Sequence, residues 1–72
     1  MLIDVRTANE YRRGHYAGSV NIPLDELKNF QIQDKATAIR VYCKSGGRSA
    51  KAKEILKAKG YTNVVDLGGF DK

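Results

Sequence analysis

Four short apolar runs alternate along this chain with segments that favour helices, and few folds accommodate that alternation. The runs are rich in branched apolar residues and are typical of buried strands: residues 2–5, 19–22, 38–42 and 64–67. Three helix-forming segments lie between them: residues 7–13, 24–30 and 49–59. Because the connections are short, the strands are expected to run parallel with crossover helices. We therefore predict an α/β fold, a small three-layer parallel sheet of about four strands with helices on both faces.

Two helix ends carry local signals. Thr7 and Glu10 have the spacing of a capping box, and Gly14 is placed to end the short helix that follows. Gly60 is placed just after the last helix, with Tyr61 positioned to pack back against the helix in a Schellman ending.

Length and charge narrow the classes of protein. The 72 residues suffice for one domain, residues 1–72, and the net charge of +5 favours anionic partners. Four lysines between residues 51 and 59 are interpreted as a solvated helix face, and no base-stacking or zinc-finger pattern accompanies them, so we expect no nucleic-acid partner. No apolar run has membrane-spanning length and no signal peptide is visible. We expect a monomer without membrane contact, cytoplasmic, or periplasmic if a signal peptide precedes the chain.

The chain has one cysteine, which excludes an internal disulfide and a closed zinc site of four protein ligands, since only one histidine accompanies it. A lone cysteine is usually an inert apolar filler. Here, however, Cys43 follows a predicted strand and precedes a loop that leads into the best predicted helix; the loop residues are Lys44, Ser45, Gly46, Gly47, Arg48 and Ser49.

This loop has the composition of an anion cradle. Gly46 and Gly47 permit backbone angles that turn successive N–H groups inward, and the positive end of the following helix points to the same place. A thiolate at Cys43 is thereby stabilised, so its pKa should lie below the free value of about 8.5. Lys44 and Arg48 add positive charge, and Arg48 has a planar fork suited to an oxyanion. The competing interpretation is a flexible turn beside a buried cysteine. Walker A and dinucleotide fingerprints are absent.

The chain resembles the single-domain rhodaneses, the thiosulfate sulfurtransferase family. Five segments carry the resemblance in order: residues 2–6, residues 14–23, the loop from Cys43 to Arg48, Gly60 with Tyr61, and residues 64–69. The resemblance implies that Cys43 takes sulfur from a small anionic donor, thiosulfate, as a persulfide and passes it to cyanide or a thiol. It implies no metal and no organic cofactor.

Two alternatives stay open. A non-catalytic persulfide carrier or binding module would keep the same fold. A small phosphatase or arsenate reductase is disfavoured because the related phosphatases have five residues between Cys and Arg, whereas this loop has four.

The resemblance also suggests supporting residues and an arrangement. Asp4 and Arg6 resemble positions that brace the loop, although an ordinary strand-end ion pair explains Arg6 equally well. His15 is expected to form structural hydrogen bonds rather than act as a base. The implied strand order is fourth, third, first, second. Relatives usually carry further elements at both ends, which predicts some uncovered apolar surface here.

Overall fold

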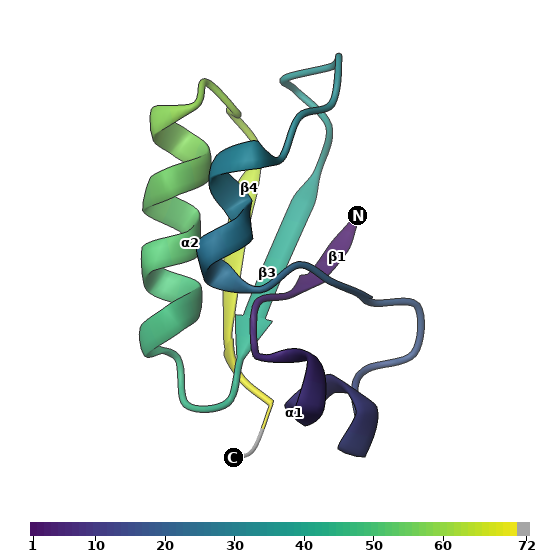
Figure 1. The fold of residues 1–72 in the computed structure, drawn as a ribbon. Coiled ribbons are helices and arrows are strands. Elements are labelled where there is room, and N and C mark those ends of the chain that lie inside the picture. The colour runs from purple at the N-terminus through teal and green to yellow at the C-terminus, as the bar shows by residue number, and fades with distance from the viewer. Residues whose placement is uncertain (71–72) are drawn as a thin grey trace.

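The sheet contains four parallel strands, and its carboxyl edge gathers the loops that follow β1 and β3 (Figure 1). The computed structural model describes residues 1–70. The strands are β1 Leu2–Asp4, β2 Val20–Asn21, β3 Ile39–Cys43 and β4 Val64–Gly69. The helices are α1 Ala8–Arg13, the 3-10 helix η1 Leu24–Asn29, and α2 Gly47–Ala58. The sheet order β2-β1-β3-β4 confirms the predicted order. No helix within residues 1–70 is long and apolar enough to cross a membrane.

Both predicted helix-end signals are confirmed. The Thr7 hydroxyl accepts from the Glu10 N–H, and the Glu10 carboxylate accepts from the Thr7 N–H, which completes the capping box of α1. At the end of α2, Gly60 has a φ of +97°. The Tyr61 N–H donates to the Leu56 carbonyl, and the Gly60 N–H donates to the Lys57 carbonyl, as a Schellman motif requires. These local bonds fix where α1 begins and where α2 ends.

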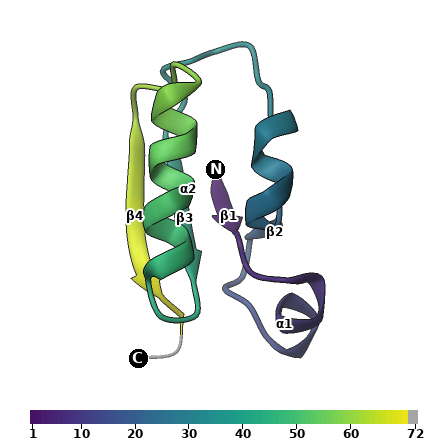
Figure 2. The ribbon, with the colours of Figure 1, turned by 60° about the vertical axis from the view of Figure 1, so that its left-hand side comes forward.

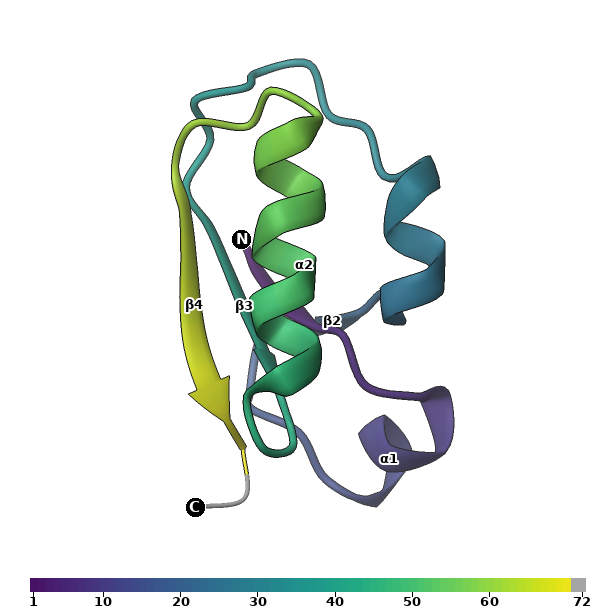
Figure 3. The ribbon, with the colours of Figure 1, turned by 90° about the vertical axis from the view of Figure 1, so that its left-hand side faces the viewer.

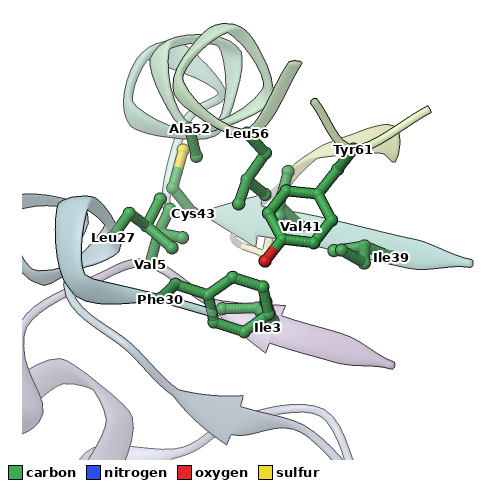
Figure 4. Packing of buried hydrophobic residues seen from close by; sticks show 10 residues of the cluster. All are labelled: Ile3, Val5, Leu27, Phe30, Ile39, Val41, Cys43, Ala52, Leu56 and Tyr61. Carbon is green, nitrogen blue, oxygen red and sulfur yellow. The ribbon is translucent and has the colours of Figure 1, made fainter. Parts of the chain in front are cut away.

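One face of the sheet carries the core. The figures show α2 and η1 side by side over this face (Figures 2 and 3), and α1 lies beyond the carboxyl ends of the strands. Alternate strand residues point into the layer between sheet and helices, where they meet side chains from both helices (Figure 4). The fully or almost fully buried members are Ile3, Val5, Leu27, Phe30, Ile39, Val41, Cys43, Ala52, Leu56 and Tyr61.

Within residues 1–70, the other face of the sheet is covered only at its carboxyl end and carries no helix (Figures 2 and 3), which differs from the predicted three layers. Tyr16 and Phe70 pack against the buried ring of Tyr42, with ring centroids 4.7 and 5.8 Å from it. Farther along this face, Val65 and Leu67 are 48% and 40% exposed. The physical reason is the position of α1, which lies beyond the carboxyl ends of the strands rather than over this face (Figures 2 and 3) and has no buried residue. The α/β class and parallel sheet are as predicted.

Candidate active site

Cys43 is the last residue of β3, so the strand delivers its side chain to the carboxyl edge of the sheet, facing the start of α2 (Figure 4). The Gly46 N–H donates to Cys43 Sγ at 2.9 Å. Ser49 Oγ lies 3.5 Å from Sγ and donates to the Gly46 carbonyl at 3.0 Å. The side chains of Ala52, Leu27 and their neighbours close the apolar side, and Cys43 is fully buried. The thiol therefore sits between an apolar wall and a ring of polar donors.

The backbone of the loop depends on two glycines, only one of which was foreseen. Gly46 has a φ of +104°, which suits a residue without Cβ, whereas Gly47 is already the first residue of α2 and needs no such angle. Gly69, at the end of β4, is the second. A Cβ placed there would lie 2.5 Å from the Lys44 carbonyl oxygen, so β4 and the loop approach each other as closely as a glycine allows.

Burial and hydrogen bonding shift the pKa of the Cys43 thiol in opposite directions. Burial raises its pKa, while the Ser49 hydroxyl and the backbone N–H groups of Ser49, Gly46 and Ser45 lower it, and the net pKa lies below the ordinary value. These N–H groups belong to the loop and to the first turn of α2, whose end carries partial positive charge. The direction matches the sequence prediction, and directed hydrogen bonds cause it.

The structure places Arg48 differently from the sequence expectation of a free oxyanion-binding fork. Its two terminal nitrogens, Nη1 and Nη2, donate to Glu10 Oε1 and Oε2 at 2.7 and 3.0 Å, a bidentate ion pair between α2 and α1. The hydrogen bond from Arg48, followed by that from the Thr7 backbone, lowers the pKa of Glu10 to about 2. The pair ties α1 to the start of α2.

Asp4 and Arg6 form the ion pair that the sequence analysis weighed for Arg6. Arg6 Nη2 lies 2.6 Å from Asp4 Oδ2 and also 2.6 Å from the Gly14 carbonyl oxygen. Both side chains are buried, and the hydrogen bond with Asp4 holds the pKa of Arg6 above its ordinary value. Within residues 1–70, neither side chain hydrogen-bonds to loop residues 44–49. Arg6 instead lies 4.6 Å from the Phe70 ring centroid.

A hollow of about 270 Å³ opens beside the loop, and we call it the mouth pocket. It is lined by Arg6, Glu10, Arg13, Gly14, Lys44 and Phe70. Lys44 and Ser45 are exposed, as expected for loop residues. His15 is not among these lining residues: its Nδ1 is 2.8 Å from the Tyr11 carbonyl oxygen and its ring stacks on Tyr11, the kind of contact expected of a structural histidine. Within residues 1–70, no three His, Cys, Asp or Glu side chains gather as metal ligands.

Comparison with known proteins identifies this arrangement. Residues 1–72 match the protein family described as the rhodanese-like domain. The chain belongs to the rhodanese-like family. Thiosulfate sulfurtransferase PspE of Escherichia coli (strain K12) is 44% identical over 71 residues, covering 94% of this chain and 68% of PspE.

Two further relatives of this rhodanese-like chain bear on its fold and function. A solved structure described as rhodanese with anions from E. coli superposes with a TM-score of 0.87 at 44% identity, covering 94% of this chain and 84% of that one. YrkF of Bacillus subtilis (strain 168), named as a sulfur carrier protein, is 34% identical over 67 residues, covering 92% of this chain and 36% of YrkF.

Sequence reasoning missed two residues of this rhodanese-like site. Glu10 had been assigned to the capping box alone, and its second contact, with Arg48, spans 38 residues of sequence. A capping glutamate carries no local sign of a distant partner. Gly69 entered the sequence analysis only within residues 64–69, as part of the family resemblance, and its contact with the loop depends on how β4 registers against β3. The double glycine itself was the available signal, because a glycine within a strand often marks a close backbone approach.

Proposed function

We propose that this protein is a thiosulfate sulfurtransferase that carries sulfane sulfur as a persulfide on Cys43. The observation that carries the proposal is the hydrogen bonding of Sγ. A buried thiol would ordinarily resist ionisation, yet the Gly46 N–H reaches Sγ at 2.9 Å, and the donors of the loop bring its pKa below the ordinary value. A thiolate ready to attack is the requirement for the first step.

The reaction consists of two displacements. The Cys43 thiolate attacks the outer sulfur of thiosulfate and forms a new S–S bond. The S–S bond of thiosulfate breaks, and its electron pair leaves with sulfite. An acceptor, cyanide or a thiolate, then attacks the outer sulfur of the persulfide and releases the Cys43 thiolate. Each displacement moves one sulfur atom and consumes no external oxidant or reductant.

The surroundings suit the charges that these steps carry. The N–H groups at the start of α2 stabilise anionic sulfur on Cys43 before and after each transfer. In the mouth pocket, Lys44 and Arg13 offer positive charge to the sulfonate end of the donor. No acid–base residue is needed, because sulfite and the thiolate both leave as anions.

The test is thiocyanate formation from thiosulfate and cyanide. Wild type should form thiocyanate and, after thiosulfate alone, show one added sulfur atom by mass spectrometry that cyanide removes. Cys43→Ser should do neither, since the chain has no other thiol. Transfer that persists in Cys43→Ser would reject the proposal, as would faster hydrolysis of an aryl phosphate than consumption of thiosulfate, the result expected of a phosphatase.

A second candidate is persulfide carriage without turnover, which the similarity to YrkF supports. The same hydrogen bonds to Sγ would stabilise a stored persulfide as well as a transient one. The two functions differ in the second displacement. A carrier would load one sulfur atom per chain and discharge it slowly to small acceptors, whereas the enzyme forms many equivalents of thiocyanate.

A further inference from the structure

The cations near Cys43 divide into compensated and uncompensated groups. Arg6 is paired with Asp4, and Arg48 is paired with Glu10. Within residues 1–70, no carboxylate lies within ion-pair distance of Arg13 or Lys44, the other cations of the mouth pocket. Four basic side chains surround the mouth pocket or the adjoining loop, but only two of them, Arg13 and Lys44, are not compensated by a carboxylate of residues 1–70.

Glu10 is held firmly in the position that compensates Arg48. Besides the two nitrogens of Arg48, its Oε1 accepts from the Thr7 N–H at 3.0 Å and lies 3.1 Å from the Thr7 hydroxyl. Its side chain is 26% exposed and lines the mouth pocket directly. The carboxylate is thus a fixed negative charge at the entrance, anchored by the N-terminus of α1 rather than mobile on the surface.

We propose that Glu10 is a specificity-determining residue, which limits how strongly the site prefers highly charged sulfur donors by compensating Arg48. This inference rests on the proposed sulfur transfer for its substrates. Removing the carboxylate leaves the Arg48 guanidinium uncompensated, so that three cations attract the donor instead of two. The attraction between these cations and the donor grows with the donor's charge. Removing the Glu10 carboxylate therefore strengthens the binding of a dianion more than that of a monoanion.

Glu10→Gln isolates this charge. Glutamine at the third helical position still closes a capping box, so α1 keeps its N-terminal bonds. The donors are thiosulfate, a dianion, and methanethiosulfonate, a monoanion with a transferable outer sulfur. The ratio of their kcat/KM values should shift about fivefold toward thiosulfate, the effect of one unit charge at about 4 Å in water. The matched control is Glu54→Gln, an exposed α2 carboxylate outside the mouth pocket, which should leave the ratio unchanged. Equal loss with both donors in Glu10→Gln would indicate a merely structural role and overturn the proposal.

Arg48→Gln provides the reciprocal test. It leaves Glu10 as an uncompensated negative charge, so the ratio should shift away from thiosulfate. The double variant Glu10→Gln, Arg48→Gln restores a neutral pair and should return the ratio close to that of wild type. If the double variant instead keeps the ratio of Arg48→Gln, the Glu10 charge does not act on the donor, and the proposal is wrong.

Alkylation of Cys43 separates this inference from sulfur transfer itself. Iodoacetate carries one negative charge and iodoacetamide none. The rate of alkylation by iodoacetate divided by the rate with iodoacetamide therefore reports the charge at the entrance of the mouth pocket, and no sulfur donor is needed. The ratio should rise in Glu10→Gln and fall in Arg48→Gln. An unchanged ratio overturns the role of Glu10 even if thiosulfate is consumed. A shifted ratio in a protein that transfers no sulfur supports the role of Glu10 and rejects the proposed function.

Discussion

Gly69→Ala tests whether the end of β4 sets the shape of the Cys43 loop. The added Cβ would lie 2.5 Å from the Lys44 carbonyl oxygen and 3.2 Å from Ser45 Cα, and both are backbone atoms that cannot rotate away. Since real Cβ contacts do not fall below 3.0 Å, β4 and the loop must separate by about half an ångström. Overpacking of this kind costs about 1–3 kcal/mol. The displaced loop should also hold its N–H groups farther from Cys43, so the thiol pKa should rise.

Urea unfolding and the pH dependence of alkylation measure the two consequences. With a slope of about 1 kcal/mol per molar urea, the expected cost lowers the unfolding midpoint by about 1–3 M. Gly47→Ala is the control, because its Cβ would meet no heavy atom within 4 Å. Replacing a helical glycine by alanine raises the free energy of unfolding by about 0.5–1 kcal/mol. If Gly69→Ala unfolds at the same urea concentration as Gly47→Ala, with an unaltered alkylation midpoint, the close approach does not shape the loop.

Three further changes have defined outcomes. Ser49→Ala should raise the pKa of Cys43, because the Ser49 hydroxyl, 3.5 Å from Sγ, is one of the groups that lower it; an unchanged alkylation midpoint contradicts this. Glu10 has a folded pKa of about 2 against an ordinary 4.5, so its stabilising effect is present above pH 4.5 and lost as the pH falls toward 2. Wild type should therefore lose more stability than Glu10→Gln across that interval in acid unfolding, and parallel curves would refute the pairing. Lys44→Ala should reduce thiosulfate kcat/KM about fivefold at low salt, the effect of one cation about 8 Å from a dianion in water, and less at high salt; a salt-independent loss would exclude a charge effect.

The sequence predicted well those parts of the fold that depend on neighbouring residues. The capping box at Thr7 and the Schellman ending at Gly60 each involve residues a few positions apart, so the pattern alone determined them. The position of Cys43 at a strand end followed equally from the run of apolar residues before it. Strand order required the family resemblance, because no local feature states which strands pair.

The parts that sequence reasoning did not predict depend on three-dimensional placement. Arg48 was expected to face an oxyanion because its fork suits one, but the fold places Glu10 within 3.0 Å of that fork, and the carboxylate occupies it. Gly46 and Gly47 were treated alike, since either permits a positive φ; only Gly46 has one, because α2 begins at Gly47. Within residues 1–70, no helix covers the second face, because α1 lies beyond the carboxyl ends of the strands (Figures 2 and 3).

The state of the Cys43 thiol depends on backbone N–H groups and on one buried side chain, Ser49, rather than on the exposed side chains of the loop. Cys43 is a member of the hydrophobic core, and burial by itself would raise its pKa. The lowering that outweighs burial comes from the Ser49 hydroxyl and from N–H groups of residues 45, 46 and 49, whose directions are set by the positive φ of Gly46 and the close approach of Gly69. Side chains at exposed loop positions can therefore vary with the sulfur donor while the thiolate remains stabilised. A small domain can keep a reactive thiol in this way, because the same first turn of α2 that closes the core over Cys43 also supplies the donors that ionise it.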